Sequence, residues 1–208
     1  MKILGIMGSP HSGGSTDIAL TEFLRICSSE IRSDDDTVLF KAKSVETSKV
    51  SLALGVPKSC TGCWACTRGQ DSYGAGICIH RDMDATYNEM IHADAIVVAS
   101  PVYFGNVTSQ LKALMDRTAS LRIHSPVLSG KLGMGIACGY ARNGGQETTL
   151  QSIHGFMLMH NMRVVGDGWP SMHYGVTIVG PTAKDKAGRD MLFSAAINLL
   201  THLKERRK

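Results

Sequence analysis

The chain has 208 residues, a length that suits one α/β domain and is short for two. Its 22 Lys and Arg against 18 Asp and Glu give a net charge of +4, and only 6% of its residues are aromatic, which argues against nucleic-acid binding. No apolar run approaches the roughly 20 residues of a membrane helix, and no secretory signal pattern is visible, so we expect a cytoplasmic protein without a membrane partner.

Apolar runs and helical spacings alternate along the chain. The run at 2–9 ends in Gly-Ser-Pro and predicts a buried strand, followed by a helix with Ser15 or Thr16 as its N-cap. Segment 44–59 shows neither pattern and is expected to be irregular. We predict further strands at 37–43, 94–100, 131–139 and 163–169, and further helices at 83–93, 109–120, 146–161 and 184–207.

Strands that alternate with helices predict a parallel sheet with helices on both faces. Five strands fit the flavodoxin-like order 2-1-3-4-5, a three-layer α/β sandwich. We find no repeat or linker and expect one domain over 1–208, with a cysteine-rich insertion at 58–80. Ligands of such sheets bind at the carboxyl ends of the strands, so we expect function in the loops after the first, third and fourth predicted strands.

The loop after the first strand is rich in hydroxyl groups. Its polar side chains, just before a helix N-terminus, are Ser9, His11, Ser12, Ser15 and Thr16. Hydroxyls and free backbone N–H groups at a helix N-terminus suit a monophosphate, whereas a triphosphate would need a lysine that this loop lacks. An ordinary Ser/Gly-rich turn explains the same residues equally well.

The loops after the third and fourth strands contain aromatic residues and glycines. The third-strand loop is Pro101, Val102, Tyr103, Phe104, Gly105 and Asn106, and the fourth-strand loop includes Gly139, Tyr140, Gly144, Gly145, Gln146 and Glu147. Adjacent aromatics suit the face of a flat ring, although packing in the core also explains Tyr103 and Phe104. Glycines let backbone amides reach a ring edge. One loop for a monophosphate and two for a planar ring together predict FMN.

Four of the six cysteines lie within nineteen residues, in the pattern C-x₂-C-x₂-C-x₁₁-C formed by Cys60, Cys63, Cys66 and Cys78. Consecutive x₂ spacings can surround one 4Fe–4S cluster, with a fourth thiolate from nearby chain. Structural zinc prefers two separated C-x₂₋₄-C pairs, and only one such group is present here. A reduced loop without metal is a third interpretation. We expect Cys27 and Cys138 to be buried structural residues.

Three segments resemble the cofactor loops of the NADPH-dependent FMN reductase family: GSPHSGGST (8–16), SPVYFGNVTSQLKALMDRT (100–118) and CGYARNGGQETTLQSI (138–153). The resemblance implies that Ser9, His11, Ser15 and Thr16 hold the phosphate. It also implies that 101–106 lines the isoalloxazine, with Gly139, Tyr140 and 144–147 at its far edge. His11 is a departure, since family members often carry Arg or Lys there.

With its cysteine segment, the chain is similar to the iron–sulfur flavoproteins, a branch of the same family. Their last cysteine gap is usually shorter than the eleven residues found here, TRGQDSYGAGI (67–77), whose three glycines would let the loop fold back. The departure bears on Cys78 more than on the other three cysteines.

The resemblance implies a flavin-dependent oxidoreductase that passes electrons between a 4Fe–4S cluster, FMN and a small-molecule or protein acceptor, with NAD(P)H or ferredoxin as donor. We assign no catalytic acid or base. The alternatives are an NAD(P)H-dependent FMN or quinone reductase without a cluster, and a non-enzymatic flavodoxin-like carrier. We expect a homodimer or homotetramer, because the apolar run FMLMHNM (156–162) and the exposed ring edge of this family favour association; a buried helix also explains that run.

Overall fold

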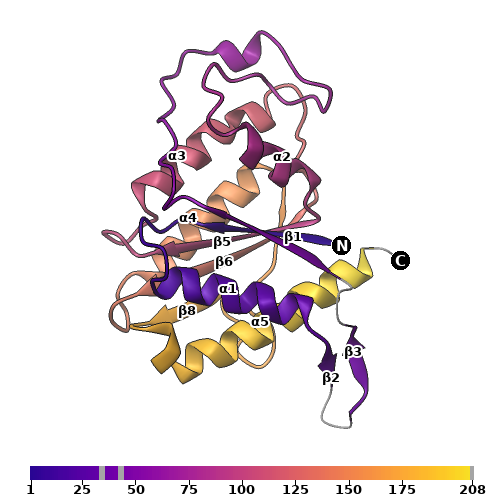
Figure 1. Cartoon of the computed structure of the whole chain (residues 1–208), viewed down its shortest axis with the longest axis vertical. Coiled ribbons are helices and arrows are strands. Elements are labelled where there is room, and N and C mark those ends of the chain that lie inside the picture. Colours follow the sequence, from indigo (N-terminus) through magenta and orange to yellow (C-terminus); the bar gives the residue numbers. More distant parts are fainter. Residues whose placement is uncertain (33–35, 42–44, 207–208) are drawn as a thin grey trace.

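A parallel sheet forms the middle of the molecule (Figure 1). The computed structural model describes residues 1–32, 36–41 and 45–206. The sheet order is β4-β1-β5-β6, and β7 and β8 both pair with β6, all in parallel. The predicted flavodoxin-like order 2-1-3-4-5 is confirmed, with its fifth place shared by two short strands. The bounds are β1 (Lys2–Met7), β4 (Glu46–Ser51), β5 (Ala95–Pro101), β6 (Leu132–Gly139), β7 (Arg163–Val164) and β8 (Val176–Val179).

The second strand of the sheet is not the predicted segment 37–43. Within that segment β3 (Val38–Phe40) pairs antiparallel with β2 (Ile31–Arg32) outside the main sheet, and residues 42 and 43 lie outside the described residues. The second place belongs to β4, in the segment expected to be irregular. Because β4 is an edge strand without a single buried residue, it needs no apolar run, and the sequence pattern missed it.

The predicted strand 163–169 is also shorter than expected. Only Arg163 and Val164 form β7, opposite the start of β6, and β8 pairs with the end of β6 after an irregular loop. That loop folds tightly on itself, since a Cβ at Gly166 would lie 2.5 Å from the carbonyl oxygen of His173.

Helices cover both faces of the sheet, α1 and α5 on one and α2, α3 and α4 on the other (Figure 1). The N-cap of α1 is Gly14 rather than Ser15 or Thr16. The predicted helix 109–120 divides into α3 and the 3₁₀ helix η2, and residue 207 of the last predicted helix lies outside the described residues. The bounds are α1 (Ser15–Ser28), α2 (Asp84–His92), α3 (Ser109–Arg117), η2 (Thr118–Leu121), α4 (Gln146–Met159) and α5 (Lys186–Glu205); two further 3₁₀ turns are η1 (Ala65–Thr67) and η3 (Thr182–Lys184).

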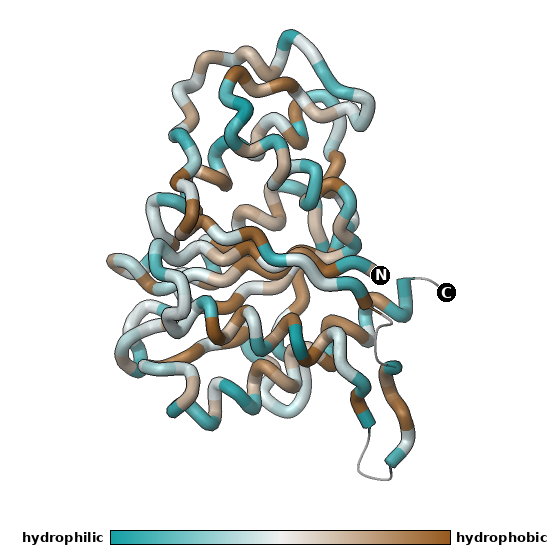
Figure 2. Tube along the Cα trace, viewed as in Figure 1, coloured by the Kyte–Doolittle hydropathy of each residue, from teal (hydrophilic) through white to brown (hydrophobic). Residues whose placement is uncertain are grey.

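The core is one apolar layer on each face of the sheet. β1, β5 and β6 are buried along nearly their whole length, and Figure 2 shows the hydrophobic residues concentrated along these central strands. Cys27 and Cys138 are buried, as predicted, and burial raises the pKa of each thiol to about 12. Both therefore remain protonated at neutral pH.

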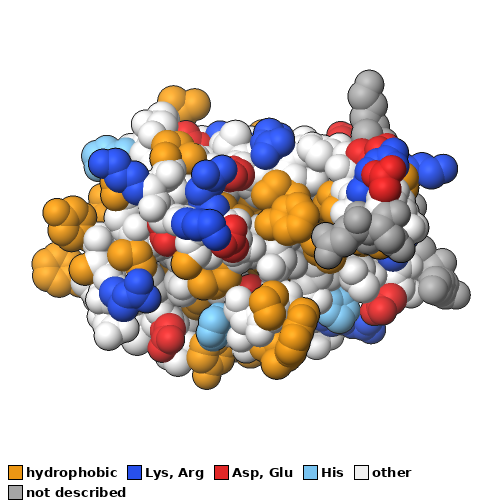
Figure 3. Space-filling model, turned by 90° about the horizontal axis from the view of Figure 1, so that it is seen from below, with side chains coloured by type: hydrophobic (Ala, Val, Ile, Leu, Met, Phe, Trp, Pro, Cys, Tyr) orange, Lys and Arg blue, Asp and Glu red, His pale blue; other side chains and the backbone are white. Residues whose placement is uncertain are grey.

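The surface mixes charged and apolar side chains. On the side of α5 and the β2–β3 hairpin, basic and acidic groups lie next to one another with hydrophobic side chains between them (Figure 3). In the run 156–162, Met157 and Met162 are buried, while Leu158 and Met159 are more than 60% exposed. Among the described residues, no helix is both long enough and apolar enough to cross a membrane.

Candidate functional site

Three loops meet at the carboxyl ends of β1, β5 and β6, because these strands are neighbours in the sheet. The buried hydroxyl of Thr108 donates a 2.5 Å hydrogen bond to the carbonyl oxygen of Gly8, which joins the β5 loop to the β1 loop. The amide of Val102 donates to the carbonyl oxygen of Cys138 at 2.9 Å and joins the β5 loop to β6. The structure therefore brings the three predicted cofactor loops together.

The β1 loop leaves the start of α1 open. No side chain caps α1, so the hydroxyls of Ser15 and Thr16 are not used as its cap. Ser9 is buried and its Oγ accepts from the amide of His11 at 3.0 Å, which fixes the turn, whereas His11 and Ser12 are exposed. An uncapped helix N-terminus with hydroxyls beside it can bind a phosphate.

Asp17 contributes a negative charge to the first turn of α1. Partial burial opposes its ionisation, but hydrogen bonds from the Gly13 amide and from Lys49 lower the pKa of its carboxyl below the ordinary value. Lys49 Nζ lies 2.6 Å from Asp17 Oδ1. Because Lys49 pairs with this carboxylate, the charge of the first turn is balanced when an anion approaches.

The β5 loop carries its aromatic residues at the surface. Tyr103 and Asn106 exchange two backbone hydrogen bonds of 2.9 and 3.0 Å, and the two residues between them, Phe104 and Gly105, both have positive φ. The turn leaves Phe104 fully exposed and Tyr103 42% exposed. Core packing therefore does not explain these rings, whereas contact with a flat ligand or another chain would.

The β6 loop is packed closely against the β5 loop. Gly145 has φ +94°, and a Cβ there would lie 3.0 Å from both Gly105 Cα and Val102 Cγ1. Gln146 braces the loop from inside, since its side-chain oxygen accepts from the Gly144 amide at 2.9 Å. Tyr140 stands 96% exposed at the start of the loop.

The eleven-residue gap before Cys78 folds back on itself. The amide of Asp71 donates to the carbonyl oxygen of Ala75 at 2.8 Å, and its carboxylate accepts from the amides of Tyr73 and Ala75. Outside the turn from Asp71 to Ala75, the amide of Ile77 donates to the carbonyl oxygen of Gly69 at 3.0 Å. This hairpin-like loop shortens the long gap and returns the chain toward the other three cysteines.

The four cysteines of the segment line one hollow of about 40 Å³, which is closed at its base by residues 116, 117, 119 and 120 at the end of α3 and in η2. Cys60 and Cys63 are exposed and leave the hollow open on their side. Burial, followed by the neighbouring thiols of Cys78, Cys60 and Cys63, raises the pKa of Cys66.

A cluster and a single ion place different demands on these thiols. Within the described residues, no group of three or more His, Cys, Asp or Glu side chains could hold a single metal ion. A single ion needs ligands that meet at one point. The thiolates of a 4Fe–4S cluster each bind a different iron, so they need not meet at one point.

Comparison with known proteins decides the family. The sequence profile described as NADPH-dependent FMN reductase matches residues 1–177. The chain belongs to this family. It is 42% identical over 200 residues to an iron–sulfur flavoprotein of Methanocaldococcus jannaschii and 38% identical over 200 residues to one of Methanosarcina thermophila, in each case over 96% of this chain and 93% of the relative.

A solved structure of a WrbA-like flavodoxin from Agrobacterium tumefaciens shares the fold, with a TM-score of 0.63 at 14% identity over 98% of this chain and 97% of that chain. Membership of the NADPH-dependent FMN reductase family makes this chain a flavin-dependent oxidoreductase. The three loops are thus the expected location of the flavin, and their individual contacts with it stay predictions.

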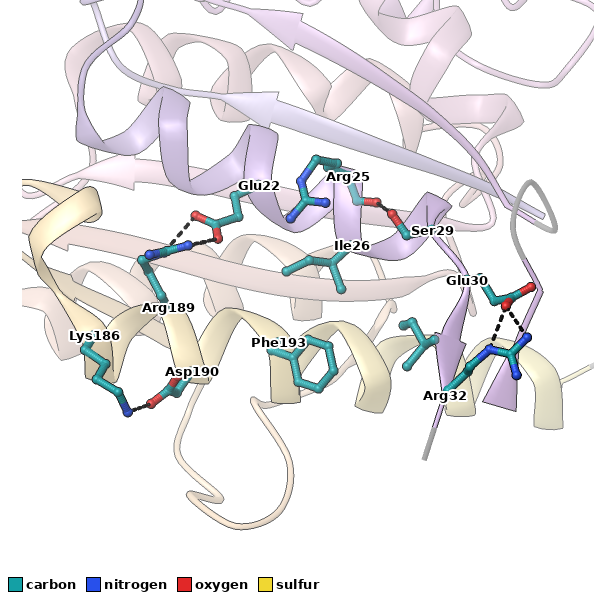
Figure 4. Close-up of a pocket in the computed structure, with 11 residues that line it drawn as sticks. Glu22, Arg25, Ile26, Ser29, Glu30, Arg32, Lys186, Arg189, Asp190 and Phe193 are labelled. Atoms are coloured by element: carbon teal, nitrogen blue, oxygen red, sulfur yellow. Dashed lines mark hydrogen bonds and ion pairs between the residues drawn. The ribbon is translucent and has the colours of Figure 1, made fainter. Parts of the chain in front are cut away.

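A pocket of about 550 Å³ between α1 and α5 lies apart from these loops (Figure 4). Its charged groups form ion pairs between Arg189 and Glu22 at 3.0 Å and between Lys186 and Asp190 at 3.0 Å, and Phe193 projects into it from α5. Because these ion pairs satisfy the charged groups of α5 within the protein, we assign this pocket no role in the flavin chemistry.

Three residues outside the cysteine pattern make contacts that support the cysteine segment. Gly76 donates its amide to the carbonyl oxygen of Ser120 at 2.7 Å, His124 Nε2 lies 2.9 Å from the carbonyl oxygen of Cys66, and Arg117 lies against Cys78. These contacts join positions 39 to 58 residues apart, so no local spacing could have found them. Of these three residues, Arg117 lies in the family-like segment 100–118, second from its end.

Proposed function

We propose that this member of the family is an iron–sulfur flavoprotein that passes electrons between a 4Fe–4S cluster, FMN and an acceptor. The cluster ligands would be Cys60, Cys63, Cys66 and Cys78. The observation that carries the proposal is that all four thiols line one hollow despite the eleven-residue gap. The relatives named iron–sulfur flavoproteins support it, since they align with 96% of this chain.

The described residues fit both groups. Ser9, Ser15 and Thr16 at the uncapped start of α1 would bind the phosphate of FMN, with His11 and Ser12 at its open side. The β5 and β6 loops, 101–106 and 139–147, would hold the ring between exposed aromatics and closely packed glycines. When bound, FMN converts between one- and two-electron transfer, and the cluster transfers single electrons.

The two proposed sites would lie at opposite ends of α3. The flavin loops precede its N-cap, Thr108, and the thiol hollow touches its last residues, Asp116 and Arg117. Nine helical residues span roughly 14 Å. The chain's own contribution would therefore be to fix the separation of the two groups by a helix.

The donor and the acceptor belong to the proposal as well. A hollow of about 820 Å³ opens beside the β6 loop and the start of α4, lined by Gly145, Gln146 and Thr148 among others. It gives room for a small acceptor or for the nicotinamide end of NAD(P)H. A protein donor such as reduced ferredoxin would instead deliver electrons at the exposed cysteines, and we place the protein in the cytoplasm, where thiols stay reduced.

Iron and flavin analysis of anaerobically purified protein tests the proposal. We expect about four irons and one FMN per chain and a broad visible absorbance that dithionite bleaches. Cys78→Ser should lose most of the iron and keep FMN, while Cys27→Ala, which removes a core thiol, should keep both. Flavin without iron in the wild-type protein would instead show an NAD(P)H-dependent FMN or quinone reductase without a cluster, and unchanged iron in Cys78→Ser would refute Cys78 as the fourth ligand.

A further inference from the structure

The guanidinium of Arg117 contacts several parts of the cysteine segment and of the chain beside it. Its side chain is only 1% exposed, and Nη1 lies 2.7 Å from Asp82 Oδ1 and 3.3 Å from the carbonyl oxygen of Lys58. Nη2 donates to the carbonyl oxygen of His80 at 2.7 Å and to Cys78 Sγ at 3.7 Å. One buried cation therefore contacts a thiol, a carboxylate and two backbone carbonyls.

These contacts fasten both ends of the segment to the end of α3. Lys58 lies two residues before the first cysteine, and His80 lies two residues after the last. Asp82 closes the arrangement, since its other oxygen accepts from the amide of Lys58 at 3.0 Å. On the helix side, the Tyr87 hydroxyl of α2 donates to the carbonyl oxygen of Arg117 at 3.0 Å. A planar fork with five donors suits such a junction better than a lysine would.

One donor of Arg117 has no partner. Its Nε is buried without a hydrogen bond among the described residues, and the side chain lines the same hollow as the thiols. A buried N–H without an acceptor is unfavourable, because it has lost its hydrogen bond to water. Nη2, by contrast, already donates to Cys78 Sγ, so a thiolate at this position would strengthen a contact that is present in the structure.

We propose that Arg117 is the positioning residue of Cys78 and raises the reduction potential of the cluster. The inference rests on the proposed function. Reduction adds one electron and transfers no atom, so the negative charge on the cluster and its thiolates increases. A fixed cation that donates an N–H···S hydrogen bond stabilises the more negative state, and hydrogen bonds to the sulfurs are a known control of cluster potentials.

The test compares Arg117→Gln and Arg117→Lys with Asp82→Asn in iron-loaded protein. The readouts are iron and FMN per chain and the cluster potential, titrated anaerobically with dithionite and followed by electron paramagnetic resonance. We expect the potential to fall in Arg117→Gln, to fall less in Arg117→Lys, and to rise in Asp82→Asn, which leaves the cation without its carboxylate. Arg117→Gln should also hold less iron at unchanged FMN, because the segment is no longer fastened.

Arg68→Gln is the matched control for charge alone. Arg68 is exposed and its Nη2 donates to the carbonyl oxygen of Cys63 at 3.4 Å; after the hydrogen bonds of the Ala65 amide and of Thr61, its charge is a minor cause that lowers the pKa of the Cys63 thiol. Solvent screens such a charge, so the potential should stay near the wild-type value. A shift in Arg68→Gln as large as that in Arg117→Gln would overturn the N–H···S assignment.

The remaining outcomes also decide. Wild-type iron content and potential in Arg117→Gln overturn the inference. If both Arg117 variants lose iron but keep FMN, the positioning role is supported, and the potential of Asp82→Asn decides the electrostatic role: an unchanged value overturns it. If the two Arg117 variants lose FMN as well as iron, the cluster potential of Asp82→Asn still decides the electrostatic role: an unchanged potential overturns it. An iron-free wild-type protein refutes the proposed function itself, which is distinct from iron-loaded variants that behave as the wild type.

Discussion

A side chain at Gly76 would collide with the backbone of the cysteine segment. A Cβ at this position would lie 2.3 Å from the carbonyl oxygen of Cys66 and 2.9 Å from Ile123 Cγ2. The clash is with backbone, which cannot rotate away as a side chain would. We therefore expect Gly76→Ala to displace Cys66 and to lower the iron bound per chain to less than about half, as measured by iron analysis after reconstitution.

Gly69→Ala is the control for this prediction. Gly69 lies in the same eleven-residue gap, but its added Cβ would meet only Ile77 Cδ1 at 3.8 Å, an ordinary contact. Its iron content should match the wild type. Equal iron content in Gly76→Ala and Gly69→Ala would show that the close approach to Cys66 does not control the ligand.

Protonation of buried His160 is expected to make the unfolding free energy depend on pH. Thr118 Oγ1 donates its proton to the carbonyl oxygen of Met115 at 2.6 Å. His160 Nε2 lies 2.9 Å from the same Thr118 Oγ1, so this ring nitrogen must carry the proton and donate it to the hydroxyl. Nδ1 is buried without a partner among the described residues. Burial and then the charge of Arg122 lower the pKa of His160 from 6.5 to about 4.

Because the folded-state pKa of His160 is the lower one, the unfolded chain binds the proton first as the pH falls. The stabilisation is complete above pH 6.5 and is lost progressively toward pH 4, with about 2 kcal/mol of unfolding free energy lost at pH 5. Urea unfolding at pH 7 and pH 5 measures this loss. In His160→Gln the difference between the two pH values should shrink by that amount; an equal difference in both proteins would contradict the assignment.

At the scale of elements, the start of α3 couples the helix to the proposed phosphate loop. Thr108 Oγ1 accepts from the amide of Leu111 at 3.2 Å as the N-cap and donates to the carbonyl oxygen of Gly8. Thr108→Ala removes both bonds from a fully buried position, so we expect a loss of about 2 kcal/mol in unfolding free energy and weaker FMN binding.

Thr108→Ser keeps the hydroxyl and separates the two effects of this change. It should retain FMN affinity close to the wild type, measured by fluorescence titration of the apoprotein, with a smaller loss of stability from the missing methyl group. If Thr108→Ser and Thr108→Ala bind FMN equally weakly, the hydroxyl is not what holds the β1 loop.

The elements that could be predicted are those whose burial requires a run of consecutive apolar residues. β5 and β6 are buried on both faces, so 94–100 and 131–139 read as apolar runs with small or β-branched residues. β4 is a polar edge strand and gives no such signal, whereas β8, with four β-branched residues between two glycines, was overlooked because the fifth strand was expected at 163–169. The cofactor loops were predicted because parallel topology fixes where they lie.

What supports the cysteine segment could not be predicted in the same way. The spacing of the first three cysteines is a local pattern, whereas the return of Cys78 depends on Asp71, on the room at Gly76 and on Arg117. The Arg117 contact exists only once α3 has packed against the sheet, and the turn at Asp71 and the close approach at Gly76, although more local, have no periodicity in the sequence.

At the scale of the whole molecule, the exposed aromatics of the flavin loops indicate association. Phe104, Tyr140 and Tyr103 expose large apolar rings on two loops that contact each other. Most large apolar side chains of a monomer are at least partly covered, and a contiguous exposed group marks an interaction site. We propose that a second copy of the chain covers these rings in a homodimer or homotetramer.

Phe104→Asn tests this association without disturbing the chain's own packing. Phe104 makes no buried contact within the chain, and Asn tolerates its positive φ, so the thermal midpoint of apoprotein diluted below its association constant should stay unchanged. Sedimentation equilibrium should show a weaker association by about tenfold or more, because buried aromatic anchors dominate interface energies. Val38→Thr, on the β2–β3 hairpin away from these loops in Figure 1, should associate as the wild type does. A wild-type protein that sediments as a monomer, or Phe104→Asn that associates as tightly as the wild type, would show that these rings face only the flavin.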